Sequence, residues 1–260
     1  MQEAVIIGAC RTPVGDFNGS LKKIAATKLG AIAINEAIRR AQVDPAQVNE
    51  LIMGCVLPHG LGQNPARQAC FISDLPDSIE CLTINKVCGS GLKAIMLAAQ
   101  AIACGDAEIV VAGGMENMNQ CPYLLPRARS GYRMGSAEVI DGMVHDGLWD
   151  QLNNFHMGFT AELIADKFEV SREDMDRFAA SSYAKALAAQ QAGNFKEEIV
   201  GVPVPQRKGE PKIFDEDEPP RETSLEALAN LRPAFKPDGR VTAGNSSKIS
   251  DGASAVVVTS

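Results

Sequence analysis

Strand-type and helix-type segments alternate through about the first 115 residues, which limits this part of the chain to a sheet covered by helices. Short apolar runs predict strands over residues 4–9, 51–56, 79–87 and 109–112. Helices are predicted over residues 24–41, from residue 65 onward, and from residues 88–91 to residue 104. Gly113 and Gly114 are expected to end the strand that precedes them. This pattern is typical of an α/β fold.

The character of the chain changes after about residue 118, where strong strand signals stop for some distance and turn residues become common. Helices are predicted over residues 156–168, 171–192 and 225–231, and a surface excursion over residues 202–220. A β-branched run over residues 255–259 predicts a strand that rejoins the sheet. We therefore expect an α/β core formed by residues 1–117 and 251–260, with residues 118–250 as an inserted domain.

The composition is that of an ordinary soluble globular protein, with 260 residues, 45% hydrophobic and 22% charged. A net charge of −7 argues against nucleic acid as the main partner, but leaves room for an anionic small molecule on a local basic patch. We find no run of about 18 uncharged apolar residues, so no membrane span is expected. The first residues do not resemble a signal peptide, and a cytoplasmic protein is expected.

Cysteine and histidine spacing gives no sign of a metal or disulfide site. The seven cysteines are odd in number and no pair has CxxC spacing, so most are expected to be reduced, buried thiols. His59, His145 and His156 are too far apart in sequence to indicate a metal site, and none is expected. His59 and His145 are expected to be structural or surface residues.

Cys88 carries the strongest chemical signal in the sequence. It lies where a predicted strand ends, the chain turns, and a helix begins. The partial positive charge of a helix N-terminus favours the thiolate over the thiol, and the thiolate is the form that attacks a carbonyl carbon. Gly89 and Gly91 would let a bulky acyl thioester approach the backbone. Taken alone, the same pattern also fits a core cysteine or a redox sensor.

The helix that follows Cys88 is apolar almost all round. Over residues 92–103 only Lys93 and Gln100 are polar, so this helix is expected to be buried on every side. A chain of this size offers limited cover for such a helix. We therefore expect a homo-oligomer, a dimer or a tetramer.

The segment over residues 85–94 resembles the acyl-accepting cysteine motif of thiolases. Further segments resemble thiolase segments in thiolase order, over residues 10–13, 62–68, 113–118, 156–158, 231–235 and 241–247. The resemblance covers essentially the whole chain. It points to the N-terminal half of a thiolase of the acetyl-CoA acetyltransferase type.

This resemblance implies a thiolase-like fold, the first half of a five-layer αβαβα architecture, with an inserted loop domain that binds coenzyme A. It implies condensation of two acetyl-CoA to acetoacetyl-CoA, or the reverse thiolysis, through an acyl group on Cys88. Coenzyme A would be a substrate, with no permanently bound cofactor. The implied setting is fatty acid metabolism.

The resemblance also places coenzyme A contacts at His156, Met157, Arg221, Phe235, Ala243 and Ser247. Each position has a simpler alternative. Met157 and Phe235 fit a core, Ser247 fits a turn, and Arg221 fits a solvated surface. A guanidinium group at Arg221 also suits phosphate recognition.

The chain departs from the family in two respects. The family's general-base histidine and second reactive cysteine belong to the second half of the fold, whereas this sequence stops at Ser260. The chain alone is therefore expected to be catalytically incomplete, either truncated or one subunit of a split enzyme that lacks its C-terminal partner. Lys248 stands where many relatives have glycine and is expected to alter the pantetheine side of the pocket.

Three alternatives remain open. A longer-chain 3-ketoacyl-CoA thiolase belongs to the same class, although the His156–Met157 pair resembles the short-chain kind. A ketoacyl synthase shares the architecture, but the long insertion is not expected there. A non-catalytic relative that binds coenzyme A or lipid is disfavoured by the intact motif around Cys88.

Overall fold

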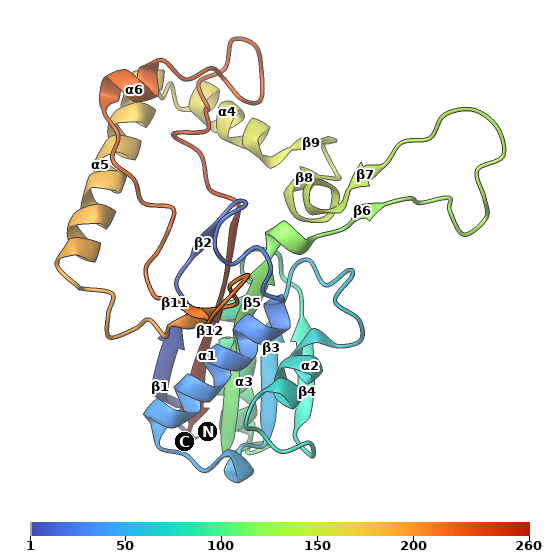
Figure 1. Ribbon diagram of the computed structural model, residues 1–260, viewed down its shortest axis with the longest axis vertical. Coiled ribbons are helices and arrows are strands. Elements are labelled where there is room, and N and C mark those ends of the chain that lie inside the picture. The colour runs from blue at the N-terminus through green and yellow to red at the C-terminus, as the bar shows by residue number, and fades with distance from the viewer. Residues whose placement is uncertain (1) are drawn as a thin grey trace. The chain divides into compact units, whose positions relative to one another are not determined.

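The computed structural model describes residues 2–260 and divides into two compact units. The first unit is formed by the residues up to Cys121, by Lys196–Glu218 and by Ile249–Ser260. The second is formed by Pro122–Phe195 and Pro219–Lys248. Figure 1 labels the helices and strands of both units.

The first unit is built on one mixed sheet. Its strands occur in the order β1 (Val5–Arg11), β12 (Ser250–Thr259), β5 (Ile109–Asn117), β3 (Glu50–Gly54) and β4 (Glu80–Ile84). The short β2 (Gly15–Asp16) pairs with one end of β12. β3 runs parallel to β4 and β5, whereas β12 runs antiparallel to β1 and β5. The last strand in the sequence therefore lies between the first and the fifth.

Helices cover both faces of this sheet (Figure 1). Side chains alternate between the two faces of a strand, and β3 shows this: Leu51 and Met53 join one buried cluster and Ile52 joins the other. The first cluster includes α1 (Ala26–Ala41) and α2 (Pro65–Ile72), and the second includes α3 (Ser90–Cys104). A short 3₁₀ helix, Pro45–Gln47, precedes β3. The expected α/β class is confirmed.

β5 is longer than the sequence predicted, because Gly113 and Gly114 continue the strand instead of ending it. The strand extends to Asn117 and pairs with β12 along its full length. A Cβ atom at Gly113 would lie 2.0 Å from the carbonyl oxygen of Ser254. Gly113 thus permits a close approach between two paired strands. In the sequence alone, a glycine with this role cannot be distinguished from a glycine that ends a strand.

The segment over residues 202–220 is exposed throughout residues 205–213, as predicted, although its residues up to Glu218 belong to the first unit. It contains the antiparallel strands β10 (Val202–Val204) and β11 (Lys212–Phe214), and Val202 is fully buried. Its acidic residues have partners in the same unit: Asp217 forms an ion pair with Arg11, and Glu218 accepts hydrogen bonds from Ser20. These two acids therefore anchor the end of the segment, whereas its middle remains exposed.

α3 buries only one face within the described chain, contrary to the expectation of burial on every side. Ser90, Ala94, Ala98 and Ile102 are buried. On the opposite face, Leu92 is 66% exposed and Met96 is 48% exposed. By length and composition the segment Val87–Cys104 could cross a membrane, and 22% of it is buried in this chain. Its buried face packs on the sheet, as that of a core helix does.

The second unit is mainly helical. It contains α4 (Met157–Lys167), α5 (Arg172–Gln191) and α6 (Leu225–Ala229). Two-residue strands pair as β6 (Tyr123–Leu124) with β7 (Ile140–Asp141), and as β8 (Trp149–Asp150) with β9 (Phe155–His156). Ser171 caps α5 by accepting a hydrogen bond from the N–H of Asp174, and the helix begins where it was predicted.

Candidate active site

Cys88 lies in a sharp turn between β4 and α3. Val87 has φ +46°, a conformation that a β-branched residue adopts only when its surroundings hold it there. The side chain of Asn85 accepts a hydrogen bond from the N–H of Val87 at 2.9 Å. Ser90 Oγ donates to the carbonyl of Val87 at 2.6 Å and accepts from the N–H of Lys86 at 2.8 Å. These bonds fix the backbone that presents the cysteine.

Glycines let the start of α3 approach the sheet. A Cβ atom at Gly54 of β3 would lie 2.6 Å from the carbonyl carbon of Ser90. A Cβ atom at Gly114 of β5 would lie 3.3 Å from the Cα of Gly91. The turn is therefore held against the ends of two parallel strands, and the position of Cys88 depends on the sheet.

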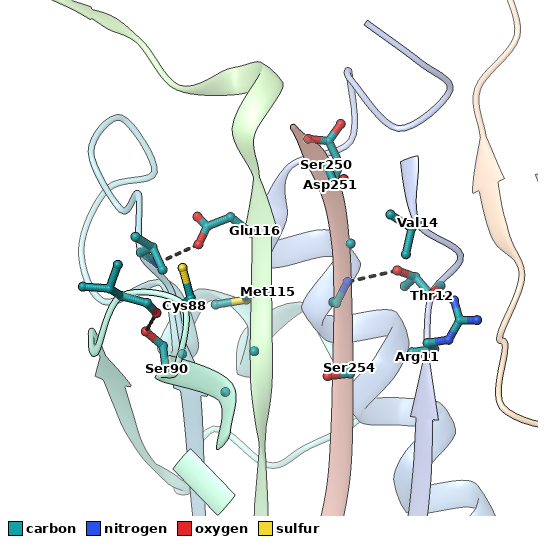
Figure 2. A pocket seen from close by; sticks show the side chains of 17 residues that line it. Arg11, Thr12, Val14, Cys88, Ser90, Met115, Glu116, Ser250, Asp251 and Ser254 are labelled. Atoms are coloured by element: carbon teal, nitrogen blue, oxygen red, sulfur yellow. Dashed lines mark hydrogen bonds between the residues drawn. The ribbon is translucent and has the colours of Figure 1, made fainter. Parts of the chain in front are cut away.

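Cys88 lines a cavity of about 420 Å³ at this end of the sheet, within the size range of small-molecule sites. The cavity is also lined by Arg11, Thr12, Glu116 and residues 250–254. Figure 2 shows the cysteine sulfur directed toward the side chain of Glu116. Cys88 is exposed and lies two residues before the helix begins. The sulfur is thus accessible, as a nucleophile requires.

Glu116 is a second functional group in this cavity, and sequence reasoning did not single it out. Its carboxylate accepts hydrogen bonds from the backbone N–H groups of Val56 at 2.7 Å and Leu57 at 3.1 Å. The thiol of Cys55 lies 3.6 Å from the same carboxylate. Burial raises the pKa of Glu116, and these hydrogen bonds oppose that shift. Only its place at the end of a Gly-rich strand could have drawn attention to it.

Three other cysteines of the first unit are buried thiols. Burial raises the pKa of Cys10 and Cys70 to about 11, and that of Cys55 to about 12. Cys10 donates its S–H to the carbonyl of Ala33 at 3.1 Å. All three are therefore protonated at neutral pH, and they fill the core as small apolar residues. Cys88 and Cys104 are the exposed cysteines of residues 2–260.

In the second unit, the structure brings His156, Met157 and Phe235 together. The rings of His156 and Phe235 stack with centroids 4.8 Å apart and planes 22° apart. Nδ1 of His156 accepts a hydrogen bond from the N–H of Gly158 at 3.0 Å and caps α4. Burial lowers the pKa of His156, so the ring is neutral with its proton on Nε2. Met157 is 44% exposed, which does not fit the alternative of a core residue.

Ser247 and Lys248 line a second cavity, of about 320 Å³, against α5. Lys248 Nζ donates to the carbonyl of Ala243 at 2.8 Å and lies 5.5 Å from the centroid of the Tyr183 ring. The lysine that departs from the family pattern thus links the loop at Ala243 to Tyr183 of α5 and directly follows Ser247 in the sequence. Ala243 and Ser247 are both exposed.

Buried acids hold the loop that carries these residues. Glu162, which is 1% exposed, accepts hydrogen bonds from the N–H groups of Arg240 at 2.8 Å and Val241 at 2.7 Å. Asn245 donates to the buried Asp176 at 2.8 Å. Sequence reasoning missed both acids, because a glutamate on one helix carries no local sign of a partner 78 residues later.

Arg221 is exposed, and within residues 2–260 no hydrogen bond holds its guanidinium group. Cys88 belongs to the first unit, whereas all six predicted coenzyme A contacts belong to the second. Among the described residues, no group of three His, Cys, Asp or Glu side chains could hold a metal ion.

Comparison with known proteins places these features in one family. Residues 4–260 match the family model described as thiolase, N-terminal domain. The chain is 55% identical to an acetyl-CoA acetyltransferase of Pseudomonas aeruginosa and 56% identical to one of Cupriavidus necator, over 100% of its own length. A probable acetyl-CoA acyltransferase of Staphylococcus epidermidis is 52% identical over 99% of the chain. The chain spans 66% of the length of each of these relatives.

Solved structures agree with this assignment and confirm the thiolase-like fold. An acetyl-CoA acetyltransferase from Syntrophomonas wolfei superposes with a TM-score of 0.97 at 42% identity. The Bacillus anthracis acetyl-CoA acetyltransferase superposes with a TM-score of 0.97 at 38% identity. The chain is covered completely in both cases, and it covers 65% and 66% of those chains. The chain therefore belongs to the thiolase family, of which it carries the N-terminal domain.

Proposed function

We propose that the protein carrying this chain is an acetyl-CoA C-acetyltransferase that uses Cys88 as its acyl carrier. The observation that carries this proposal is an exposed cysteine, held in a strained turn at a helix start, that lines a cavity of ligand size. The names of the relatives in Pseudomonas aeruginosa and Cupriavidus necator support the same reaction. Strained backbone is retained where a site requires a defined geometry.

In the proposed reaction, the Cys88 thiolate attacks the carbonyl carbon of acetyl-CoA and coenzyme A leaves as its thiol. The acetyl group is then held as a thioester, which divides one difficult condensation into two easier steps. The α-carbon of a second acetyl-CoA, once deprotonated, attacks this thioester and gives acetoacetyl-CoA. The backbone N–H of Cys88 is the proposed donor to the oxyanion that forms in the acyl transfer.

The proposed coenzyme A contacts are His156, Met157, Arg221, Phe235, Ala243 and Ser247, on an inserted domain over residues 118–250. The stacked pair of His156 and Phe235 supports this proposal, because it leaves Nε2–H of a neutral ring as a donor. Arg221 is exposed, and its guanidinium group suits a phosphate group, which supports a contact between Arg221 and coenzyme A. Lys248 would narrow the site near Ala243.

The proposed substrates are acetyl-CoA and acetoacetyl-CoA, with no permanently bound cofactor and no nucleic acid or membrane partner. The exposed face of α3, around Leu92 and Met96, supports cover by further protein. We propose that this face of α3 is covered by the C-terminal thiolase half and by other subunits of a homo-oligomer, a dimer or a tetramer. The proposed compartment is the cytoplasm.

Intact mass spectrometry after incubation with acetyl-CoA tests the role of Cys88. We expect a gain of one acetyl group in the protein that carries this chain, and no gain in Cys88→Ala. The matched control is Cys104→Ala, which removes the other exposed cysteine and should acetylate normally. Acetylation that survives in Cys88→Ala would refute the proposal.

Thiolysis rates measured with acyl chains of different length distinguish a short-chain thiolase from a longer-chain 3-ketoacyl-CoA thiolase. Thiolysis rates with acetoacetyl-CoA and with a longer 3-ketoacyl-CoA should favour the shorter substrate, because the His156–Met157 pair resembles the short-chain kind. A preference for the longer substrate would identify a degradative 3-ketoacyl-CoA thiolase instead.

A further inference from the structure

Cys121 is a thiol with an imidazole group beside it, although sequence reasoning left both residues without a role. His59 Nε2 lies 2.8 Å from Cys121 Sγ. This separation is within the hydrogen-bond reach that marks a nucleophile paired with a base. Both residues are partly exposed. The pair is separate in sequence from Cys88 and from every position proposed above as a coenzyme A contact.

The sheet topology brings the two residues together. His59 follows β3, and Cys121 follows β5 and the short 3₁₀ helix Met118–Gln120. β3 and β5 are parallel neighbours, so their carboxyl ends lie at the same edge of the sheet. Residues 62 positions apart are thereby held in contact by the framework of the first unit.

Glu116 adds a third group to this pair. Attraction to His59 is one of the interactions that lower the pKa of Glu116, against the larger effect of burial, which raises it. An imidazolium beside a thiol favours the thiolate. Cys121 and His59 are therefore arranged as a nucleophile with its base, and Glu116 is an acidic group that interacts with His59 electrostatically.

The other cysteines provide a contrast. Burial raises the pKa of Cys10, Cys55 and Cys70 to about 11 or 12, which keeps them as thiols. Cys104 is exposed at the last position of α3, at the opposite end of the helix from Cys88. Cys121 combines partial exposure with a neighbouring imidazole.

We propose that Cys121 and His59 form a second reactive thiol site, at which hydroperoxides oxidise the Cys121 sulfur to a sulfenic acid. The thiolate attacks one peroxide oxygen, a sulfur–oxygen bond forms, and the oxygen–oxygen bond breaks. The departing group, hydroxide from hydrogen peroxide or alkoxide from an organic hydroperoxide, takes the proton of the His59 imidazolium and leaves as water or an alcohol. The sulfur loses two electrons and the peroxide gains them. This site goes beyond the proposed acyl transfer and does not depend on it.

The first test is the pH profile of alkylation by iodoacetamide, read separately at each cysteine. Digestion with trypsin and a Glu-specific protease together cuts after Lys93, Glu108 and Glu116, so Cys88, Cys104 and Cys121 fall on different peptides. At pH 6 we expect Cys121 to react about tenfold faster than Cys104, because the rate follows the thiolate fraction. The rate at Cys121 should change little up to pH 8, whereas that at Cys104 should rise steeply.

Two variants test the role of the imidazole. In His59→Ala, the Cys121 rate at pH 6 should fall about tenfold and acquire the pH dependence of Cys104. His145→Ala is the control, since it removes an exposed histidine that is not beside Cys121 and should leave the Cys121 rate unchanged. The pH profile of the wild-type protein is measured without any variant. It can therefore contradict the proposal even if His59→Ala does not fold.

The second test adds hydrogen peroxide and traps sulfenic acid with dimedone. We expect the dimedone adduct to accumulate on Cys121 about tenfold more than on Cys104, and this excess to disappear in His59→Ala. Two results would each overturn the proposal. One is a Cys121 alkylation rate that rises with pH in parallel with Cys104. The other is dimedone labelling of Cys121 no greater than that of Cys104.

Discussion

The backbone N–H of Val56 donates to the carboxylate of Glu116 at 2.7 Å, which ties the loop after β3 to the end of β5. Glu116→Ala would leave this N–H and that of Leu57 without their acceptor. An unsatisfied buried donor costs about 1–3 kcal/mol. We expect the free energy of unfolding to fall by about that amount, measured by urea denaturation. No change in the denaturation midpoint would contradict this role.

Glu116→Gln keeps an oxygen acceptor for the N–H groups of Val56 and Leu57 but removes the carboxylate charge. The folded protein holds the pKa of Glu116 above its ordinary value, so its contribution to stability is present at low pH and is lost as pH rises through the folded pKa. The difference in unfolding free energy between wild type and Glu116→Gln should therefore shift in favour of the variant as pH rises. Glu210→Gln is the control, because it makes the same substitution at an exposed position.

Ser90→Ala removes the hydroxyl that bridges Lys86 and Val87. Ser90 is 4% exposed, so the lost partners are not replaced by water. We expect a loss of about 1–3 kcal/mol in the free energy of unfolding and slower acetylation of Cys88. Ser254→Ala is the matched control, because Ser254 lines the same cavity but is exposed. Equal effects of the two substitutions would show that the bridge does not position the cysteine.

Val87→Gly relieves the positive φ at the turn. Glycine adopts φ +46° without steric cost, whereas a side chain in the left-handed region costs about 1–2 kcal/mol. The greater freedom of glycine in the unfolded chain offsets about 0.5–1 kcal/mol of this gain. Urea denaturation should therefore show unchanged or higher stability, while acetylation of Cys88 slows. Val139→Gly is the control, because Val139 is exposed and its φ is not positive. This substitution should lower the free energy of unfolding of the protein.

His156→Asn keeps an acceptor for the N–H of Gly158 but removes the ring that stacks on Phe235. We expect a loss of about 0.5–1.5 kcal/mol of stability, and a further loss of about 1 kcal/mol in His156→Ala, which also lacks the cap. Because burial lowers the pKa of His156, wild type loses this histidine's contribution as pH falls from the ordinary histidine range through the folded pKa. Thermal unfolding of His156→Asn should lack that pH-dependent loss.

Local patterns predicted the helices and most strands well, because periodicity and caps are encoded in neighbouring residues. α1 and α5 begin and end within about two residues of expectation, and α2 begins at Pro65 as predicted. Gly113 was misread because a glycine needed for close packing resembles one that ends a strand.

Long-range relationships were beyond the sequence. Nothing local states that β12 inserts between β1 and β5, or that Glu162 binds the backbone at Arg240. Cys88 itself was found because a strand, a turn and a helix start are adjacent in the chain. The positive φ of Val87 was not predicted, since valine disfavours that conformation on its own. Glu116 and the pair of His59 and Cys121 depend on loops that meet only in the folded sheet.

The position of β12 also governs when the first unit can form during synthesis. A ribosome releases the N-terminal strand some 240 residues before the strand that pairs with it, as the register of Val5 with Thr259 and of Arg11 with Ser254 shows. Until then β1 has no neighbour in the sheet, and the apolar surfaces of α1 and β5 lack the strand that covers them. The nascent chain must therefore make nearly all of the second unit before the sheet can close, so protection by chaperones would be most needed over that interval.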